Sequence, residues 1–195
     1  RVRGVMFTGS TEVATLLQRN IASRLDAQGR PIPLIAETGG MNAMIVDSSA
    51  LTEQVVVDVL ASAFDSAGQR CSALRVLCLQ DEIADHTLKM LRGAMAECRM
   101  GNPGRLTTDI GPVIDSEAKA NIERHIQTMR SKGRPVFQAV RENSEDAREW
   151  QSGTFVAPTL IELDDFAELQ KEVFGPVLHV VRYNRNQLPE LIEQI

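Results

Sequence analysis

No apolar run in this sequence is long enough to cross a lipid bilayer. A membrane-spanning helix needs roughly 20 consecutive apolar residues, and the chain of 195 residues contains no such stretch. Its first residues, RVRGVMF, are too short and too interrupted for a secretory signal peptide. The sequence therefore predicts no transmembrane segment and favours a cytoplasmic location.

Cysteine and histidine are scarce, with three of each. The cysteines form no Cys-x-x-Cys pair, and an odd number favours reduced thiols over a disulfide framework. His86, His125 and His179 have no metal-ligand spacing with the cysteines. We therefore expect no metal site, and we expect each histidine on the surface or in packing rather than in catalysis.

An excess of positive charge is also absent. Lys and Arg number 21 against 26 Asp and Glu, and the net charge of -5 leaves no broad basic surface for a phosphate backbone. This balance argues against nucleic-acid binding by this segment. A content of 43% hydrophobic and 24% charged residues is typical of a folded globular protein, with room for one large domain or parts of two.

Strand-like and helix-like segments alternate along the chain, which predicts an α/β fold. We expect strands at 2–7, 32–36, 43–47, 75–80 and 177–181, and helices at 12–25, 51–64, 83–98 and 121–131, the last opened by residues 116–119. The first strand is expected to be buried, and strand-like residues are expected to resume at Thr154. The polar stretch 141–151 is predicted to be an exposed loop or hairpin tip.

Cys71 has the sequence setting that best suits a nucleophile. It lies in GQRCSA (68–73), between a predicted helix and a predicted strand, and loops of this kind present reactive side chains. Cys78 lies inside a predicted strand and Cys98 ends a predicted helix, so both are expected to pack. A thiolate can attack an aldehyde carbon, pass a hydride to nicotinamide and leave a thioester. The alternative is a buried structural thiol, the commonest role of a lone cysteine.

Glu37 is the candidate base for the second half of such a reaction. It lies in AETGG (36–40), at the end of a predicted strand, and its carboxylate could activate the water that hydrolyses the thioester. The alternative is a charged strand terminus, which would be preferred if Cys71 were absent.

Two further motifs suit a dinucleotide. FTGSTEVA (7–14) places Thr8, Gly9 and Ser10 between a predicted strand and a helix N-terminus, where free N–H groups can bind phosphate. The alternative is an ordinary helix cap by Thr8 or Ser10. KEVFGP (171–176) supplies the carboxylate of Glu172 and the ring of Phe174, and its alternative is a charged turn before a buried strand.

In this order, the motifs resemble those of the NAD(P)-dependent aldehyde dehydrogenase superfamily, and the likeness covers essentially the whole chain. ETGGMNAMIVDSSAL (37–51) and SAGQRCSALRVL (66–77) are similar to the pyrroline-5-carboxylate dehydrogenase module of the bifunctional proline-utilisation enzymes. The resemblance implies an aldehyde-dehydrogenase-like fold. Residues 1–38 would then be the C-terminal part of a Rossmann-like NAD-binding domain, and residues 39–195 a catalytic domain truncated at its C-terminal end.

The resemblance also implies a chemistry and assigns residues to it. Cys71 would form a thiohemiacetal and a thioester while NAD-dependent oxidation converts L-glutamate 5-semialdehyde to glutamate. The implied roles are these: Glu37 as general base, Thr8 and Gly9 beside the nicotinamide, Ser10 near the pyrophosphate, Glu172 on the nicotinamide ribose, Phe174 against that end of the cofactor, and Ser72 on the substrate carboxylate.

By the same resemblance, FAD would belong to a separate proline dehydrogenase domain outside this chain, and the full-length protein is expected to be a homo-oligomer. Three alternatives to this function stay open. The isolated chain is expected to be a piece of a longer enzyme, because most dinucleotide-binding strands of the resembling family are absent, so it could be folded but inactive. The substrate could belong to another aldehyde class. A Cys-dependent hydrolase would pair the thiol with a histidine, and no histidine here lies in a supporting motif.

Overall fold

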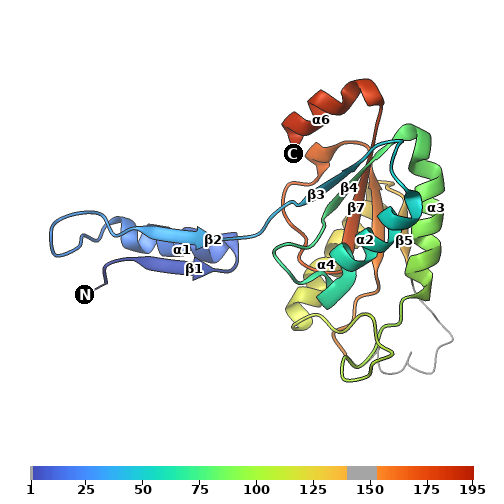
Figure 1. Cartoon of the computed structure of the whole chain (residues 1–195). Helices are drawn as coiled ribbons and strands as arrows, with labels where there is room; N and C mark the ends of the chain where they lie inside the picture. Colours follow the sequence, from blue (N-terminus) through green and yellow to red (C-terminus); the bar gives the residue numbers. More distant parts are fainter. Residues whose placement is uncertain (1, 140–152) are drawn as a thin grey trace. The chain divides into compact units, whose positions relative to one another are not determined.

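A computed structural model describes residues 2–139 and 153–195 and divides the chain into two compact units, Arg1–Gly40 and Met41–Ile195 (Figure 1). Both units combine helices with parallel strands, so the predicted α/β class is confirmed. The stretch 141–151, predicted to be a loop or hairpin tip, lies outside the described residues. Among the described residues, no helix combines the length and the apolarity that crossing a bilayer requires.

The first unit is a single strand, helix, strand repeat. It consists of β1 (Val5–Thr8), α1 (Thr11–Ala22) and β2 (Leu34–Glu37). The two strands pair in parallel, with Val5 opposite Leu34 and Thr8 opposite Glu37. The helix begins where the hydroxyl oxygen of Ser10 accepts a hydrogen bond from the backbone N–H of Val13 at 3.3 Å, which satisfies one of the unpaired donors of its first turn.

Much of the apolar surface of this unit is exposed. Met6 and its register partner Ile35 are 83% and 56% exposed, and the one buried residue of α1 is Ala14. Successive residues of a strand point to opposite faces, and a single helix covers one face of a two-stranded sheet. The expectation that the first strand is buried is therefore wrong for this unit.

The second unit is built on a five-stranded sheet. Its strands lie in the order β3 (Ala43–Val46), β4 (Val76–Gln80), β7 (Val177–Tyr183), β6 (Thr159–Leu163) and β5 (Val136–Gln138). The first four are parallel to one another, and β5 pairs antiparallel with β6. Every residue of β4 is buried, as expected for a central parallel strand covered on both faces.

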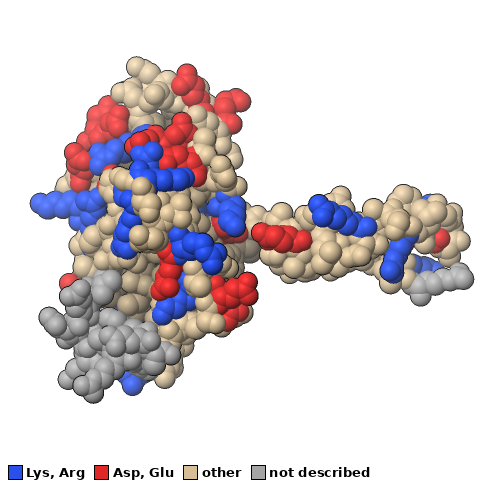
Figure 2. Space-filling model, turned by 180° about the vertical axis from the view of Figure 1, so that it is seen from behind, with Lys and Arg blue, Asp and Glu red and all other residues tan. Residues whose placement is uncertain are grey.

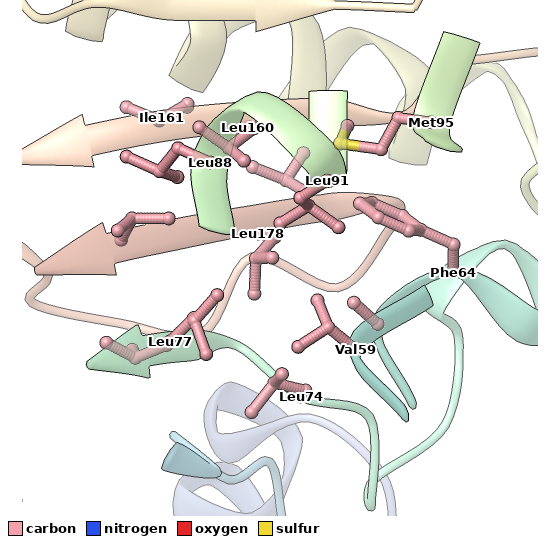
Figure 3. Packing of buried hydrophobic residues seen from close by; sticks show 14 of the residues in the cluster. Val59, Phe64, Leu74, Leu77, Leu88, Leu91, Met95, Leu160, Ile161 and Leu178 are labelled. Atoms are coloured by element: carbon pink, nitrogen blue, oxygen red, sulfur yellow. The ribbon is translucent and has the colours of Figure 1, made fainter. Parts of the chain in front are cut away.

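Helices cover both faces of this sheet. They are α2 (Thr52–Phe64), α3 (Asp81–Glu97) and α4 (Ser116–Ser131), and a shorter α6 (Leu188–Gln194) follows the last strand. Leu178 packs among residues of α2 and α3 (Figure 3), while the next residue of β7, His179, contacts His125 of α4. Because consecutive strand residues point to opposite faces, α2 and α3 lie on one face and α4 on the other.

A large part of the core of the unit lies under α2 and α3. Val59 and Phe64 of α2 meet Leu88, Leu91 and Met95 of α3 over the central strands (Figure 3). These five side chains are between 0% and 2% exposed. Their packing places the last turn of α2, and the loop that follows it, at a defined position beside β4.

Some element boundaries differ from those expected. The helix expected at 121–131 includes the residues expected to open it and begins at Ser116, because the Asp115 carboxylate accepts a hydrogen bond from the N–H of Ala118 at 2.7 Å and caps it there. Strand pairing resumes at Thr159 rather than at Thr154, because the backbone of Thr154 is used by a loop contact in which its carbonyl accepts from the N–H of Val113 at 2.9 Å. Neither β5 nor α6 was expected from the sequence.

A left-handed turn connects α2 to the Cys71 loop. Ser66, Ala67 and Gly68 have φ values of 56°, 53° and 65°, and Ser66 and Ala67 are the residues other than glycine with positive φ in the described part of the chain. A Cβ at Gly68 would lie 2.2 Å from the carbonyl oxygen of Gly175. The turn therefore presses the backbone before Cys71 directly against the segment before β7.

Charged side chains are interspersed over the surface of the second unit (Figure 2). The guanidinium of Arg182, near the end of β7, contacts Asp85 at 2.7 Å and Glu162 at 3.1 Å. Exposed pairs of this kind contribute about 0–1 kcal/mol to stability, so the core rather than these pairs positions the elements.

Substitution of Gly68 is predicted to destabilise the second unit. Gly68→Ala places a side chain in the left-handed region and against a backbone carbonyl, and it should lower the free energy of unfolding by at least about 2 kcal/mol. Gly93→Ala is the matched control, because Gly93 lies within α3 with nothing within 4 Å of its added Cβ. It should raise stability by about 0.5–1 kcal/mol. Urea unfolding measures both, and a neutral Gly68→Ala would contradict the tight approach to Gly175.

Candidate active site

The three cysteines occupy different environments. Cys71 is exposed, on the loop between the left-handed turn and β4, whereas Cys78 is completely buried within β4. Burial raises the pKa of the Cys78 thiol to about 11, so it stays protonated at neutral pH. Cys98 is partly buried at the end of α3, where its Sγ lies 3.7 Å from the carbonyl of Ala94. The loop position predicted for Cys71 is therefore the one from which a thiol reaches solvent.

Asn42 holds the Cys71 loop from the start of the second unit. Its Nδ2 donates to the carbonyl oxygens of Cys71 at 2.7 Å and Ala73 at 2.9 Å. Its own backbone carbonyl accepts from the N–H groups of Arg75 at 2.9 Å and Val76 at 3.1 Å. One residue thus ties both sides of the loop to the strand that begins at Ala43. Sequence reasoning missed it, because an asparagine before a strand has no pattern of its own.

Arg75 is a second residue that sequence reasoning missed, since it was expected only as the first residue of a strand. It is 1% exposed. Its Nε lies 2.9 Å and its Nη2 2.8 Å from Oε1 of Glu172. Nη1 donates to the carbonyls of Gly68 at 2.7 Å and Gly175 at 3.2 Å, and Nη2 donates to that of Arg70 at 3.1 Å. An arginine inside an otherwise apolar run was the available signal.

The same guanidinium also contacts Phe174. Its central carbon lies 5.2 Å from the ring centroid, within the range of a cation–π interaction. Burial lowers the pKa of Arg75, and the hydrogen bond and charge of Glu172 oppose that shift. The Glu172 side chain is 14% exposed and the Phe174 residue 45% exposed, so both remain accessible beside the buried cation.

Neighbouring side chains of the loop point elsewhere. The Arg70 guanidinium donates to the carbonyl of Ala61 in α2 at 3.0 Å and lies 4.0 Å from the Asp65 carboxylate. Gln69 accepts from the N–H of Ile114 at 2.8 Å and donates to the carbonyl of Pro112 at 3.3 Å, which docks the segment 112–114 against the loop. The loop that carries Cys71 is therefore anchored on three sides.

In the first unit, the candidate base and the phosphate-binding motif share one edge. Thr8 and Glu37 are register partners at the carboxyl ends of β1 and β2, and the N–H of Gly9 donates to the carbonyl of Glu37 at 3.0 Å. The Glu37 side chain is exposed. Ser10 caps α1 through its side chain, as the alternative interpretation expected. The carboxyl edge of parallel strands is where α/β proteins usually bind ligands.

The expected site residues thus fall into two groups. Thr8, Gly9, Ser10 and Glu37 lie in the first unit, and Cys71, Ser72, Glu172 and Phe174 lie in the second. Arg75 brings Glu172 and Phe174 to the backbone before Cys71, and Ser72 is exposed next to the thiol. Each group suits part of a dinucleotide: the second unit offers a carboxylate for ribose hydroxyls and an exposed aromatic ring, and the first unit offers a helix N-terminus for phosphate.

The histidines take no part in either group. His86 is exposed on α3, and the Nε2 atoms of His125 and His179 lie 2.8 Å apart across α4 and β7. Burial, with the nearby His125, lowers the pKa of His179 to about 3. The described residues include no cluster of three or more His, Cys, Asp or Glu side chains that could hold a metal ion.

The sequence matches the aldehyde dehydrogenase family over residues 1–194. It is 93% identical, over 195 residues, to the bifunctional protein PutA of Salmonella typhimurium. This match covers all of the present chain and 15% of the Salmonella protein. It is 33% identical, over 181 residues, to a 1-pyrroline-5-carboxylate dehydrogenase of Anoxybacillus flavithermus. This match covers 91% of the present chain and 34% of the Anoxybacillus protein. The chain therefore spans a small part of the relatives that it matches, and the resemblance predicted from the motifs is confirmed.

Solved structures resemble it as well. A crystal structure of a mutant of Proline Utilization A (PutA) from Bradyrhizobium japonicum superposes with a TM-score of 0.88 at 46% identity, over 99% of this chain and 19% of that one. A betaine aldehyde dehydrogenase from Staphylococcus aureus in complex with NAD+ gives a TM-score of 0.87 at 29% identity, over 99% of this chain and 37% of that one.

Loss of the Asn42 amide is predicted to loosen the Cys71 loop. Asn42→Asp turns a carboxylate oxygen toward two carbonyls and should destabilise the second unit more than Asn42→Ala, which should cost about 1–3 kcal/mol. Asn121→Ala is the control, because its amide contacts the exposed Arg124 and should change stability by less than about 0.5 kcal/mol. Thermal denaturation measures the series. Equal stability of the Asn42 and Asn121 variants would show that these two hydrogen bonds do not hold the loop.

Proposed function

This chain belongs to the aldehyde dehydrogenase family, and we propose that Cys71 is its nucleophile in an NAD-dependent oxidation of L-glutamate 5-semialdehyde to glutamate. The observation that carries the proposal is the exposed Cys71 thiol on a loop that Asn42 and Arg75 anchor, next to Glu172 and Phe174. The 93% identity to a bifunctional PutA and the likeness to a 1-pyrroline-5-carboxylate dehydrogenase support it.

The first step is addition to the aldehyde. The Cys71 sulfur forms a bond to the aldehyde carbon, and the carbonyl π pair moves to oxygen, which gives a tetrahedral thiohemiacetal. The backbone N–H of Cys71 is the donor in this chain that would stabilise the oxyanion. Since the Arg75 guanidinium donates to the carbonyl of Arg70 at 3.1 Å, the peptide that carries this donor is held in place.

The cofactor supplies the acceptor for the hydride that leaves this carbon. The residues proposed to hold it are Glu172 on the nicotinamide ribose, Phe174 against the nicotinamide end, Thr8 and Gly9 beside the nicotinamide, and Ser10 with the N-terminus of α1 near the pyrophosphate. The NAD+ complex of the related betaine aldehyde dehydrogenase supports the choice of cofactor. Residues 1–38 would thus be the last part of a cofactor domain, and residues 39–195 most of a catalytic domain.

Glu37 is proposed to act in the second half of the reaction. Its carboxylate takes a proton from a water molecule as that water attacks the thioester carbon, and the bond from carbon to sulfur breaks to release the Cys71 thiolate. This role is supported by the exposed Glu37 side chain at the carboxyl edge of β2, opposite Thr8 in the strand register.

The substrate proposal rests on the relatives and on Ser72. An exposed hydroxyl next to the nucleophile suits the carboxylate of glutamate semialdehyde. It offers no matching group to an unbranched aliphatic aldehyde.

In a bifunctional protein, FAD would belong to a proline dehydrogenase domain outside this chain, and a homo-oligomer stays a prediction. The chain by itself is expected to bind NAD weakly and to be inactive, because it offers two strands to a ligand that lies across several strand ends.

Two substitutions separate the two chemical steps in the full-length protein. Cys71→Ala should abolish aldehyde oxidation, because no sulfur remains to form the thiohemiacetal. Glu37→Gln should let one equivalent of NADH form rapidly and then slow turnover by ~100-fold or more, because hydrolysis of the thioester loses its base. Stopped-flow absorbance at the NADH band measures both phases.

Two matched variants control for these changes. Cys98→Ala and Glu53→Gln remove a partly buried thiol and an exposed carboxylate on other helices, and they should leave the rate within about twofold of the unmodified protein. Normal steady-state turnover of Glu37→Gln would remove Glu37 from the base role, and activity in Cys71→Ala would remove Cys71 from the mechanism.

Substrate preference is predicted to depend on Ser72. The kcat/KM for glutamate semialdehyde should exceed that for hexanal by about 100-fold or more, because a polar pocket rejects analogues that leave its groups unpaired. Ser72→Ala should raise KM for the semialdehyde and narrow this ratio by about tenfold, with little change for hexanal. Equal efficiencies for the two aldehydes in the unmodified protein would refute the substrate while leaving the reaction class intact.

A further inference from the structure

We propose that Arg75 is a positioning residue that couples the Cys71 loop to the Glu172–Gly175 segment, so that Cys71, Glu172 and Phe174 are held as one rigid body. The inference rests on the proposed function for the identity of those groups. It assigns to Arg75 no contact with the substrate or with the reacting atoms.

The first argument is the geometry of the guanidinium. It has five N–H donors and makes five polar contacts, two with Oε1 of Glu172 and one each with the carbonyls of Gly68, Arg70 and Gly175, all at 3.2 Å or less. Two of these carbonyls precede Cys71, and the other partners lie in 172–175. The donors are therefore divided between the two segments that the coupling must join.

The second argument is the use of Glu172. Both arginine contacts are to Oε1, and among the described residues no hydrogen bond to Oε2 is found. A carboxylate held through one oxygen keeps the other as an acceptor for a ribose hydroxyl. Phe174 is held in the same way, because the guanidinium lies 5.2 Å from its ring centroid while the residue stays 45% exposed.

The third argument comes from the backbone of Arg75. Its N–H donates to the carbonyl of Asn42 at 2.9 Å, and its carbonyl accepts from the N–H of His179 at 2.9 Å. The residue is thus fixed to the strands on either side of it before its side chain makes any contact. A side chain on so rigid a base transmits a displacement of Glu172 to Gly68 and Arg70 instead of absorbing it.

A lysine cannot replace this arrangement. Its ammonium has three donors on a flexible stem, so it keeps the charge but cannot hold one carboxylate and three carbonyls in a plane. Arg75→Lys is therefore a conservative variant that keeps the positive charge and removes the contacts proposed to couple the two segments. Glu172→Gln is the complementary variant, because it keeps the shape of the side chain and removes the charge that orients the guanidinium.

The test is a double-mutant cycle on the cofactor-free, full-length protein, read by amide hydrogen exchange of residues 69–73. Arg75→Lys and Glu172→Gln should each speed exchange in this segment by about tenfold, since each removes a charge-assisted hydrogen bond. The double variant should be no faster than the faster single variant. Arg182→Lys is the control: it alters a surface ion-pair arginine three residues along β7 from His179, and exchange at 69–73 should stay unchanged.

A second readout separates positioning from stability alone. Calorimetric titration with NAD should show an affinity about tenfold weaker for Arg75→Lys than for the unmodified protein, although Glu172 is intact. A purely structural arginine would lower the melting temperature and leave both this affinity and the local exchange unchanged, and that result would overturn the proposal.

The remaining outcomes are also decisive. Unchanged exchange at 69–73 in Glu172→Gln, or singles whose effects multiply in the double variant, would refute the coupling. If Arg75→Lys does not fold, Glu172→Gln alone decides, because it leaves the guanidinium in place. Absence of aldehyde oxidation in the unmodified protein would refute the proposed function, whereas the exchange data contain neither cofactor nor substrate and would still accept or reject the coupling.

Discussion

The contact between the Arg75 guanidinium and the Glu172 carboxylate, at 2.8 Å, is the interaction on which the arrangement of the second unit's site depends. A buried guanidinium is strongly disfavoured unless its charge and its N–H groups are satisfied. Here the satisfying groups are one carboxylate and three backbone carbonyls, which lie in two segments about a hundred residues apart in sequence. Burial of one cation therefore forces the Cys71 loop and the segment before β7 to meet.

The neighbouring features support that meeting. Glycine is needed at position 68, in the left-handed turn at 66–68, because a side chain there would collide with the backbone of Gly175. Asn42 holds the other side of the loop, so the thiol is exposed on a backbone that is bound on both flanks. A nucleophile benefits from this combination, since misplacement of a reacting group by about 1 Å can cost a large part of the rate. In the first unit, Glu37 and the proposed phosphate-binding motif lie on one strand edge.

Local sequence patterns predicted the elements but not the contacts between them. The strands β3, β4 and β7 and the helices α2 and α3 were expected within a few residues, because their apolar residues follow strand or helix periodicity. Asn42 was missed because Cys71 and Ala73 lie 29 and 31 residues away, and no local pattern records such distant partners. Arg75 was missed for the same reason, because Glu172 and Gly175 lie 97 and 100 residues away. The three residues of β5 are too few for a pattern, and the exposed Met6 follows from the few elements in the first unit. Cys71, Glu37 and the cofactor residues came from motifs, and their roles stay predictions.

The central claim is that the acyl group is carried by Cys71. Mixing the full-length protein with NAD and glutamate semialdehyde for a single turnover, quenching in acid and digesting with trypsin tests it directly. Trypsin should cut after Arg70 and Arg75, so the account predicts a glutamyl thioester on the peptide 71–75, in an amount that follows NADH formation. NADH formation with the acyl group on Cys78, Cys98 or no cysteine would contradict it.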